Sequence, residues 1–493
     1  MRIVVPHRPS GRLSDAWRFC VGTGRFELAL RRDYQDSLAL VQRDIGFRHI
    51  RGHGLFADGV GIHQPYEYGG ARHVRYAFTY VDQVIDAYLE LGIAPFVELG
   101  FMPSGLASGE QNVFWWRGNV TPPRSWSEWA DLVRAAVAHL VDRYGLERVR
   151  GWPIEVWNEP DLAYFWPDAD QDAYHRLYEV SAHAVKEVDA SLQVGGPGIS
   201  PGAHDDWLPR FADYVTVHNV PIDFVSRHAY SAGPAQHVPF GTHQTLAPAS
   251  TLLVQFATPR RQLRDTALAD LPVYITEFNS SYRPDNPIHD TAFHAAYLAP
   301  VVAGGGDVVD GYSYWTFSDV FEETGVPTAL FHGGFGLLTH RQIKKPTYHL
   351  YAFMARMGEH ILTRGPDHLV TRDDDGRVTV LAWAPVQLSI PLESTSAFML
   401  RSSVSEEMGN AWAAWAEMGR PLFPRPRQLD ALREAAEPVR RHRSLPVVDG
   451  RVDLDLHLDR YEVTLVEITP VTDETPLWWD EGRLLGGGDE RVR

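Results

Sequence analysis

Two glutamates stand at the ends of short apolar runs, where an uncompensated charge would be costly. Glu159 closes the run that starts at Ile154, and Glu277 closes the run that starts at Val273. A pair of carboxyl groups can cleave a glycosidic bond, because one protonates the leaving oxygen while the other attacks the anomeric carbon or activates water. A separation of roughly 5–5.5 Å would give retention of configuration, and a wider one inversion. Structural salt bridges are the alternative explanation of either glutamate.

The elements that would position this pair alternate short apolar runs with amphipathic segments, as parallel β/α units do. The expected strands are Phe19–Gly22, Phe47–Gly52, Ala94–Leu99, Ile154–Asn158, Leu192–Gly195, Phe224–His228, Val273–Glu277 and Gly311–Trp315. Tyr80–Leu91 and Trp126–Tyr144 carry apolar residues at three- and four-residue spacing and are expected to be helices, the second capped by Ser125. The pattern predicts an α/β fold of the (β/α)8 TIM-barrel type, in which functional groups collect at the C-terminal ends of the strands. A doubly wound open sheet is the alternative.

The chain changes character after about residue 350. Val370–Arg372 and Val378–Trp383 flank the turn Asp373–Gly376 and are expected to form a hairpin. Val452–Leu456 and Tyr461–Ile468 alternate as half-buried strands do. Two further segments look helical, Glu406–Met418 and Arg427–Ala436. We therefore predict an N-terminal segment 1–14 whose Arg2–Pro6 run adds an edge strand, a barrel at 15–350, an accessory β-sandwich at 351–475 with a helical insertion near 405–440, and an acidic tail at 476–493.

Composition narrows the class of partner. The 493 residues include 46 Lys and Arg against 63 Asp and Glu, a net charge of −17, which argues against binding to nucleic acid. The single cysteine, Cys20, excludes an intramolecular disulfide and a multi-cysteine metal site. The start lacks a secretory apolar segment, and no stretch of about 20 apolar residues exists to span a membrane. We expect a cytoplasmic protein with no membrane partner.

Short motifs occur in order along most of the chain. They are Ile50–Gly54, Phe96–Pro103, Gly118–Pro123, Trp157–Pro160, Asp223–Tyr230, Ile275–Asn279, Tyr312–Glu323, His332–Gly336 and Met418–Pro421. Together they resemble glycoside hydrolase family 39, and within it the β-xylosidases, from about residue 15 to about residue 470. The resemblance implies a retaining exo-glycosidase that forms a covalent glycosyl-enzyme. Such an enzyme releases xylose from the non-reducing end of xylo-oligosaccharides, or cleaves aryl xylosides.

The resemblance also implies roles for individual residues. Glu159 would be the general acid/base and Glu277 the nucleophile, and Asn158 would hydrogen-bond the sugar 2-hydroxyl. His228 and Tyr230 end the sixth expected strand and would orient the two carboxyls. The other candidates for substrate binding are His53, Phe114, Trp115, Trp116, Tyr282, Trp315, Glu322 and Glu323. The alternatives are a structural histidine at 53, core packing of the tryptophan at 315, and a solvated acidic pair at 322 and 323.

Glu98 and Glu155 fall inside expected strands, where Arg48 or Arg51 would neutralise them.

The charges of one expected loop bear on the choice of substrate. The loop Asp319–Glu323 carries three acidic residues and no Lys or Arg, which favours a neutral sugar over the uronate that the α-L-iduronidases of this family cleave. Xylose lacks the exocyclic carbon of a hexose, so a pocket closed by aromatic rings would select it. The leading prediction is a β-xylosidase; the alternative is a relative that cleaves an α-L-arabinopyranoside or an iduronide.

The alternatives to a glycoside hydrolase are a barrel that only binds sugar and a metal-dependent hydrolase. A barrel that binds sugar without cleaving it would lack one of the catalytic carboxyls, and both are present. The histidines show no spacing typical of metal ligands, and Gly22-Thr-Gly24 does not open a phosphate-binding helix, so no metal and no cofactor is predicted. The sequence also allows the protein to form a homo-oligomer. Phe278 stands where related sequences often have Tyr, which leaves one hydroxyl fewer behind the nucleophile.

Overall fold

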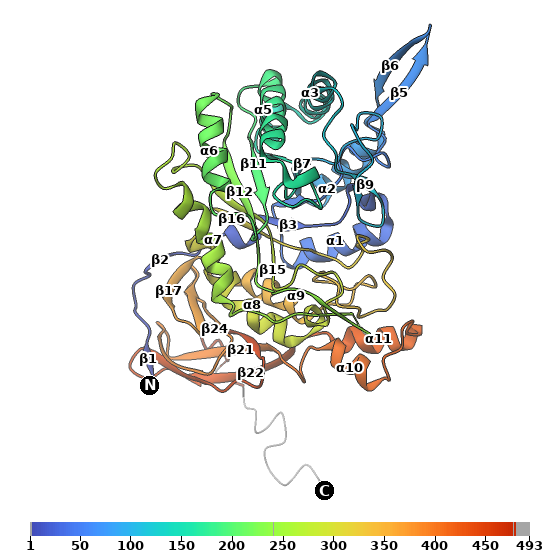
Figure 1. Ribbon diagram of the computed structural model, residues 1–493. Coiled ribbons are helices and arrows are strands. Elements are labelled where there is room, and N and C mark those ends of the chain that lie inside the picture. Colours follow the sequence, from blue (N-terminus) through green and yellow to red (C-terminus); the bar gives the residue numbers. More distant parts are fainter. Residues whose placement is uncertain (1, 240, 477, 480–493) are drawn as a thin grey trace.

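Eight parallel strands close into a barrel in this computed structural model, which describes residues 2–239, 241–476, 478 and 479. The strands are β3 (Cys20–Gly22), β4 (His49–Arg51), β7 (Ala94–Leu99), β10 (Ile154–Val156), β11 (Val194–Ile199), β12 (Phe224–Tyr230), β15 (Val273–Asn279) and β16 (Gly311–Tyr314). They follow one another in chain order around the barrel, and β16 pairs with β3 to close it (Figure 1). Each expected strand overlaps one of these eight. The (β/α)8 barrel is therefore confirmed, and the open sheet is excluded.

Helices connect the strands and cover the outside of the barrel (Figure 1). The α-helices are α1 (Arg32–Asp44), α2 (Thr79–Glu90), α3 (Trp126–Tyr144), α4 (Leu146–Val149), α5 (Gln171–Val188), α6 (Trp207–Val217), α7 (Ser250–Leu263), α8 (Ala292–Gly304) and α9 (Pro346–Met354). Short 3-10 helices are η1 (Ala16–Arg18), η2 (Phe26–Leu30), η3 (Pro167–Ala169), η4 (Pro287–Asp290) and η5 (Gly305–Asp307). Helix α3 has the expected bounds, because Trp129, Leu132, Val133, Ala136, Val137 and Leu140 form one buried face. The Ser125 hydroxyl caps it by accepting the Glu128 amide at 3.3 Å.

Two further sheets combine strands from the C-terminal part of the chain with two short strands that precede the barrel. Their strands are β1 (Ile3–Val4), β2 (Gly11–Arg12), β17 (His360–Arg364), β18 (His368–Arg372), β19 (Val378–Ala382), β20 (Val386–Pro391), β21 (Ser396–Val404), β22 (Val439–Pro446), β23 (Arg451–Leu456) and β24 (Val463–Val471). One sheet has the order β2-β17-β18-β19-β24-β21-β22, and the other has the order β1-β20-β23, with β1 at an edge. Inward side chains of both sheets, such as Val370, Leu388 and Val466, share one apolar core. The division of the chain at residues 14, 350 and 475 stays a prediction, and the expected tail lies outside the described residues except for 476, 478 and 479.

The helical insertion contains α10 (Ala411–Glu417) and α11 (Pro426–Ala435), which pack against Phe331 and Ile343. Helix α10 begins at Ala411 rather than at Glu406, so the prediction was too long at its start. The Ser405 hydroxyl accepts the amides of Glu407 and Met408 and folds this stretch into a turn instead.

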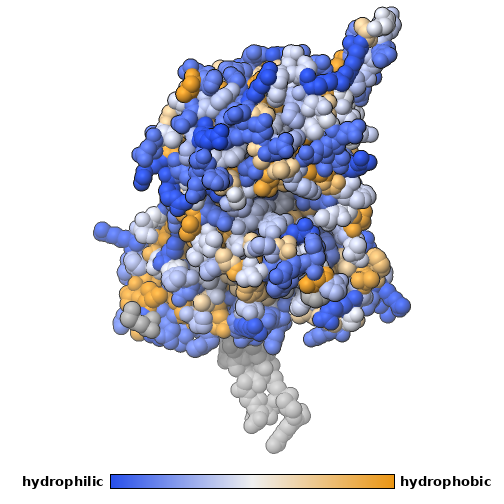
Figure 2. All heavy atoms as spheres, in the orientation of Figure 1, coloured by the Kyte–Doolittle hydropathy of each residue, from blue (hydrophilic) through white to orange (hydrophobic). Residues whose placement is uncertain are grey.

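Three two-stranded hairpins in the loops were not predicted. They are β5 (His63–Tyr68) with β6 (Ala71–Tyr76), β8 (Asn112–Val113) with β9 (Gly118–Asn119), and β13 (Gln236–Val238) with β14 (Gly241–His243). The β5–β6 hairpin projects away from the barrel (Figure 1). Polar residues cover most of the face drawn in Figure 2, and apolar residues form scattered patches on it. Within the described residues, none of the helices combines the length and the apolar character needed to cross a membrane.

A buried lysine fixes the chain segment after β16. The Lys345 ammonium lies 2.6 Å from Asp290 Oδ1 and 2.7 Å from Asp319 Oδ2, and all three side chains are buried. Burial opposes the charge of Lys345, but the two carboxylates outweigh it and raise the pKa of this ammonium group. The Asp319 carboxylate also accepts the Gly336 amide at 2.7 Å. This cluster therefore sets the path of the loop that continues to Glu323.

Replacing Lys345 with Met should lower the free energy of unfolding by about 3–5 kcal/mol, because Asp290 and Asp319 would stay buried without their cation. Thermal unfolding followed by circular dichroism measures the change as a lower Tm. Lys344→Met is the matched control, since the Lys344 ammonium pairs with Asp44 and Glu437 nearer the surface and should contribute less. Equal losses in the two variants would contradict the importance of the buried cluster.

Candidate active site

The two glutamates meet in a pocket of about 520 Å³ at the C-terminal ends of the barrel strands. Glu277 lies within β15, and Glu159 lies on the loop that follows β10. His53 after β4, Tyr230 at the end of β12 and Trp315 after β16 line the same pocket. Parallel strands bring their carboxyl ends to one face of the barrel. Residues far apart in the chain therefore surround one small space.

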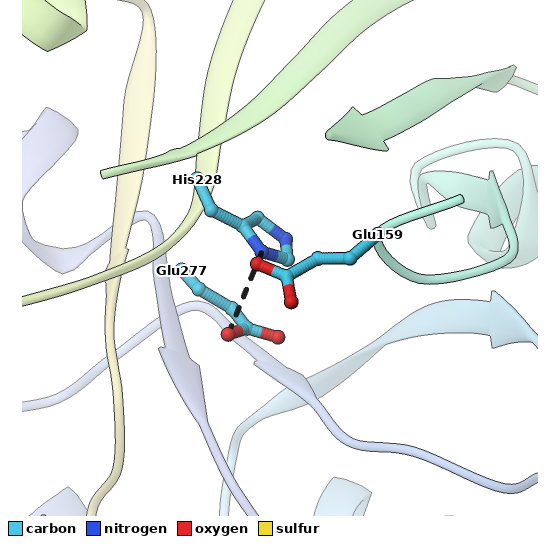
Figure 3. A group of neighbouring side chains, drawn as sticks. All are labelled: Glu159, His228 and Glu277. Atoms are coloured by element: carbon cyan, nitrogen blue, oxygen red, sulfur yellow. Dashed lines mark hydrogen bonds and ion pairs between the residues drawn. The ribbon is translucent and has the colours of Figure 1, made fainter. Parts of the chain in front are cut away.

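Glu159 and Glu277 face each other across this space, with His228 beside them (Figure 3). One oxygen of each carboxyl and one ring nitrogen of His228 all lie within 4.8 Å of one another. Carboxyl groups roughly 5–5.5 Å apart suit direct attack by one of them on the sugar, whereas inverting pairs stand roughly 6.5–9.5 Å apart to admit a water. An approach of two carboxyl oxygens to within 4.8 Å is closer to the retaining spacing than to the inverting one.

Three groups surround the carboxylate of Glu277. Arg51 Nη1 lies 2.7 Å from Oε1, and the Tyr230 hydroxyl donates to Oε2 at 2.8 Å. His228 Nδ1 lies 3.6 Å from the same Oε2. A charge-assisted contact from a guanidinium and a hydrogen bond from a hydroxyl both favour the ionised form of a carboxyl. These contacts hold the side chain in the orientation that a nucleophile needs.

Arg51 serves more than the nucleophile. Its guanidinium is buried and also lies 2.6 Å from Glu155 Oε2 and 2.9 Å from Glu98 Oε2. Burial opposes the charge of Arg51, but the carboxylates around it raise its pKa. Of the two arginines that the sequence offered as partners of Glu98 and Glu155, Arg51 takes this role. Arg48 instead pairs with Asp15 at the surface, at 2.9 Å.

Glu159 is in the opposite electrostatic situation. Burial and, after it, the nearby charge of Asp161 raise its pKa to about 8. His228 Nδ1 lies 2.9 Å from Glu159 Oε1, and burial lowers the pKa of this histidine to about 4. At neutral pH the imidazole is therefore uncharged and Glu159 is protonated. One carboxyl of the pair is ready to give a proton while the other carries the negative charge.

The backbone before Glu159 adopts an unusual conformation. Trp157 has a φ of 72° and Glu159 a φ of 43°, in the left-handed region that residues with a side chain rarely occupy. Trp157 is fully buried, and its indole donates to the Phe165 carbonyl at 2.9 Å. The Glu159 amide donates to the Gly198 carbonyl at 3.0 Å. These contacts hold the turn that directs the Glu159 carboxyl into the pocket.

Most of the other expected residues also reach the pocket. Those that line it are His53, Phe114, Asn158, Tyr230, Tyr282, Trp315 and Glu323. His53 combines both of its expected roles. Its Nδ1 lies 2.8 Å from Glu98, as a structural histidine would, while its Nε2 lies 3.7 Å from Glu277 and 3.9 Å from Glu323. Phe278 is buried among aromatic rings, in edge contact with Phe256 and Tyr312.

Three expected residues lie elsewhere. Arg25 and Arg31 each contact the Glu322 carboxylate at 2.7 Å, which directs it away from the pocket. Trp115 is 57% exposed, and its backbone amide donates to the Glu323 carbonyl at 2.7 Å. The Trp116 ring packs against Phe101 and Phe114. Of the aromatic run 114–116, the first ring lines the described pocket, because the tight turn there sends successive side chains in different directions.

The charge argument drawn from the loop Asp319–Glu323 is corrected in the same way. Asp319 is paired with Lys345 and Glu322 with two arginines, so cations from distant parts of the sequence neutralise two of the three acids. Glu323 faces the pocket, and burial raises its pKa well above the usual range, with Glu277 and Glu159 adding to the effect. Arg283, which the sequence analysis did not consider, also lines the pocket. The composition of this loop alone therefore does not exclude an acidic sugar.

Further lining residues were missed. They are Leu162, Tyr164, Phe165, Ser200, Pro201, Gly202, Pro284, Thr324 and Phe335. Most lie on the loops after β10, β11 and β15, so their position just beyond a strand end was an available signal. Their residue types carry no catalytic signature, so they were not predicted as site residues.

Glu159, His228 and Glu277 are also the one group in the described part of the chain whose ligand atoms are close enough to hold a metal ion. Several of their polar atoms already have protein partners: His228 Nδ1 contacts Glu159, and Glu277 contacts Arg51 and Tyr230. A cation bound to Glu277 would face the guanidinium of Arg51. The carboxyl chemistry described above accounts for the cluster, and the absence of a metal or cofactor requirement stays a prediction.

Comparisons with known proteins point to one family. The model described as "Glycosyl hydrolases family 39" matches residues 1–453. A β-xylosidase of Geobacillus stearothermophilus is 46% identical over 98% of this chain and 99% of its own, and one of Caldicellulosiruptor saccharolyticus is 34% identical over 93% and 96%. The crystal structure of a monomeric β-xylosidase from Caulobacter crescentus superposes with a TM-score of 0.87 at 32% identity, covering 96% of this chain and all of that one.

The carboxyl group of Glu159 should titrate with a pKa of about 8, because burial disfavours its ionised form. Carbon-13 NMR of protein labelled at the glutamate side chains measures this value, and the spectrum of Glu159→Gln identifies the resonance. The group should be neutral below that pH and ionised above it. A pKa near the ordinary 4.5 of a glutamate would contradict the proton-donor role.

Proposed function

Because the chain belongs to family 39 of the glycosyl hydrolases, we propose that it is a retaining β-D-xylosidase that releases xylose from the non-reducing end of xylo-oligosaccharides. The observation that carries this proposal is the facing pair of carboxyls, which bring one oxygen each to within 4.8 Å of the other. The raised pKa of Glu159, about 8, suits this residue to the role of proton donor. The identity of 46% and 34% to two β-xylosidases over nearly the whole chain supports xylose as the sugar.

The first half of the reaction uses the pair in its resting forms. The ionised Glu277 attacks the anomeric carbon of the bound xylose while protonated Glu159 gives its proton to the glycosidic oxygen. The bond to the leaving sugar breaks, and an ester forms between the xylose and Glu277. Arg51 and Tyr230 keep the attacking carboxylate oriented before this step.

The second half returns the enzyme to its starting state. Ester formation removes the negative charge of Glu277, which makes ionisation of Glu159 easier. Glu159 then takes a proton from a water molecule, and the resulting hydroxide attacks the anomeric carbon and releases xylose with its original configuration. Glu159 is again protonated and Glu277 again ionised. Two inversions at one carbon give net retention.

The groups around the pair supply contacts to the sugar. The Asn158 side-chain oxygen accepts from Arg51 Nη2 at 3.0 Å, so its amide nitrogen remains to donate to the sugar 2-hydroxyl. His53 Nε2 and the Glu323 carboxyl would bind other hydroxyls, and the Trp315 ring would cover an apolar face of the sugar. Tyr282 stands 44% exposed at the pocket wall, where it would contact the leaving sugar.

A related glycoside remains the second candidate, and Arg283 is the observation that favours it. A guanidinium beside the sugar is the group that would bind the carboxylate of an iduronide. The Arg283 side chain lies 3.3 Å from Asp285, however, and this carboxylate already offsets its charge. We therefore keep xylose as the proposed sugar. The cytoplasmic location, the exclusion of nucleic-acid and membrane partners, and the formation of a homo-oligomer stay predictions.

Purified enzyme should cleave nitrophenyl β-D-xyloside in preference to the α-L-arabinopyranoside, the β-D-glucoside and the α-L-iduronide, with retention visible by proton NMR. Glu277→Ala should lower kcat by roughly 10⁴-fold or more, because it removes the nucleophile. Glu159→Ala should be rescued by azide, which attacks the xylosyl-enzyme without needing a base. Glu110→Ala, at an exposed glutamate, is the control that should keep its activity.

Each alternative has its own outcome in this assay. Preference for the iduronide would keep the mechanism and replace the sugar. Inversion of configuration, or full activity of Glu277→Ala, would contradict the assignment of the pair.

A further inference from the structure

Asp161 is a largely buried acid that the steps above do not use. It follows Glu159 by two residues on the loop after β10. Both of its oxygens are bound by one residue of the next loop: Oδ1 accepts the Ser200 amide at 2.8 Å, and Oδ2 accepts the Ser200 hydroxyl at 2.5 Å. A carboxylate bound at both oxygens by one serine is a rigid connection between two loops.

This connection holds the wall of the pocket beside Glu159. The Glu159 amide donates to the carbonyl of Gly198, near the end of β11, so the loop of the acid is bound on both sides of Ile199. Ser200 and Pro201 line the pocket, and Arg227 of β12 donates to the Pro201 carbonyl at 3.1 Å. A chain of hydrogen bonds therefore runs from the loop of the acid to the neighbouring strand of the barrel.

Burial raises the pKa of Asp161, while the hydrogen bonds from Ser200 and the charge of Arg227 on β12 favour its ionised form. Both hydrogen bonds come from uncharged groups of Ser200. After burial, the charge of Asp161 is the largest cause of the raised pKa of Glu159. Like charges at short range disfavour ionisation of the second carboxyl. Glu277, by contrast, has the cation Arg51 at 2.7 Å.

We propose that Asp161 is a positioning residue for the acid/base: fixed on Ser200, it holds the loop that carries Glu159 and keeps that carboxyl protonated until the glycosidic oxygen takes the proton. The inference rests on the proposed function, in which Glu159 is the acid. A proton donor works best when its pKa lies near the pH at which the enzyme operates. An anion placed two residues along the same loop meets this requirement without touching the substrate.

The test compares the pH dependence of kcat/KM in the wild type, Asp161→Asn and Asp168→Asn, with xylobiose as substrate. The basic limb of this profile reports loss of the proton from the acid in the free enzyme. In Asp161→Asn this limb should move to lower pH by roughly 0.5 pH unit or more, because the negative charge of residue 161 is gone while the shape of its side chain is kept. Asp168 is an exposed acid seven positions along the chain, and its variant should keep the wild-type limb.

A substrate that needs no proton donor separates positioning from general damage. Dinitrophenyl xyloside has a leaving group that departs without protonation, so Asp161→Asn should form the xylosyl-enzyme from it at the wild-type rate. Ser200→Ala provides a second variant, because it removes one hydrogen bond and keeps the charge of Asp161. It should slow cleavage of xylobiose several-fold without moving the basic limb to lower pH.

The results decide the proposal in either direction. An unchanged basic limb in an active Asp161→Asn variant overturns the proposal, and so does an equal shift of the limb in Asp168→Asn. An equal loss of activity on xylobiose and on dinitrophenyl xyloside, in both Asp161→Asn and Ser200→Ala, also overturns it. Failure of the wild type to cleave any xyloside would instead refute the proposed function.

Discussion

One buried guanidinium organises the barrel interior: Arg51 contacts Glu98, Glu155 and Glu277 at 2.6–2.9 Å. Carboxylates taken out of water are costly unless a cation and hydrogen bonds replace the lost solvent. These three acids come from strands β7, β10 and β15, so the charge of one arginine on β4 links four strands through their side chains. Without it, the nucleophile would be one of three uncompensated buried anions.

The different roles that we propose for the two carboxyls follow from this arrangement. Glu277 has the cation Arg51 at 2.7 Å. Glu159 stands on a left-handed turn beyond the end of β10, where burial and an acidic neighbour keep it protonated. His228, itself neutral, lies between the two and contacts both. Two residues of the same type thus perform opposite tasks because their surroundings differ.

The sequence predicted the barrel, and it predicted two glutamates at strand ends, because both depend on regular patterns. Strand spacing, helix periodicity and glutamates at strand ends are visible along the chain, and Trp126–Tyr144 was predicted to the residue. Loop residues were harder. Glu322 and Glu323 are neighbours of identical type, yet one pairs with two arginines from the start of the chain while the other faces the pocket. Such outcomes depend on contacts between distant segments, which local patterns do not encode.

The most direct test of the account is to trap and locate the covalent intermediate. A xyloside with fluorine in place of the 2-hydroxyl and an activated leaving group forms the ester but hydrolyses slowly. Proteolysis and mass spectrometry of the trapped enzyme then identify the labelled residue. We predict one fluoroxylosyl group, attached to Glu277 and absent from Glu277→Gln. A label on Glu323 or Glu159, or an active enzyme that forms no covalent adduct, would contradict the account.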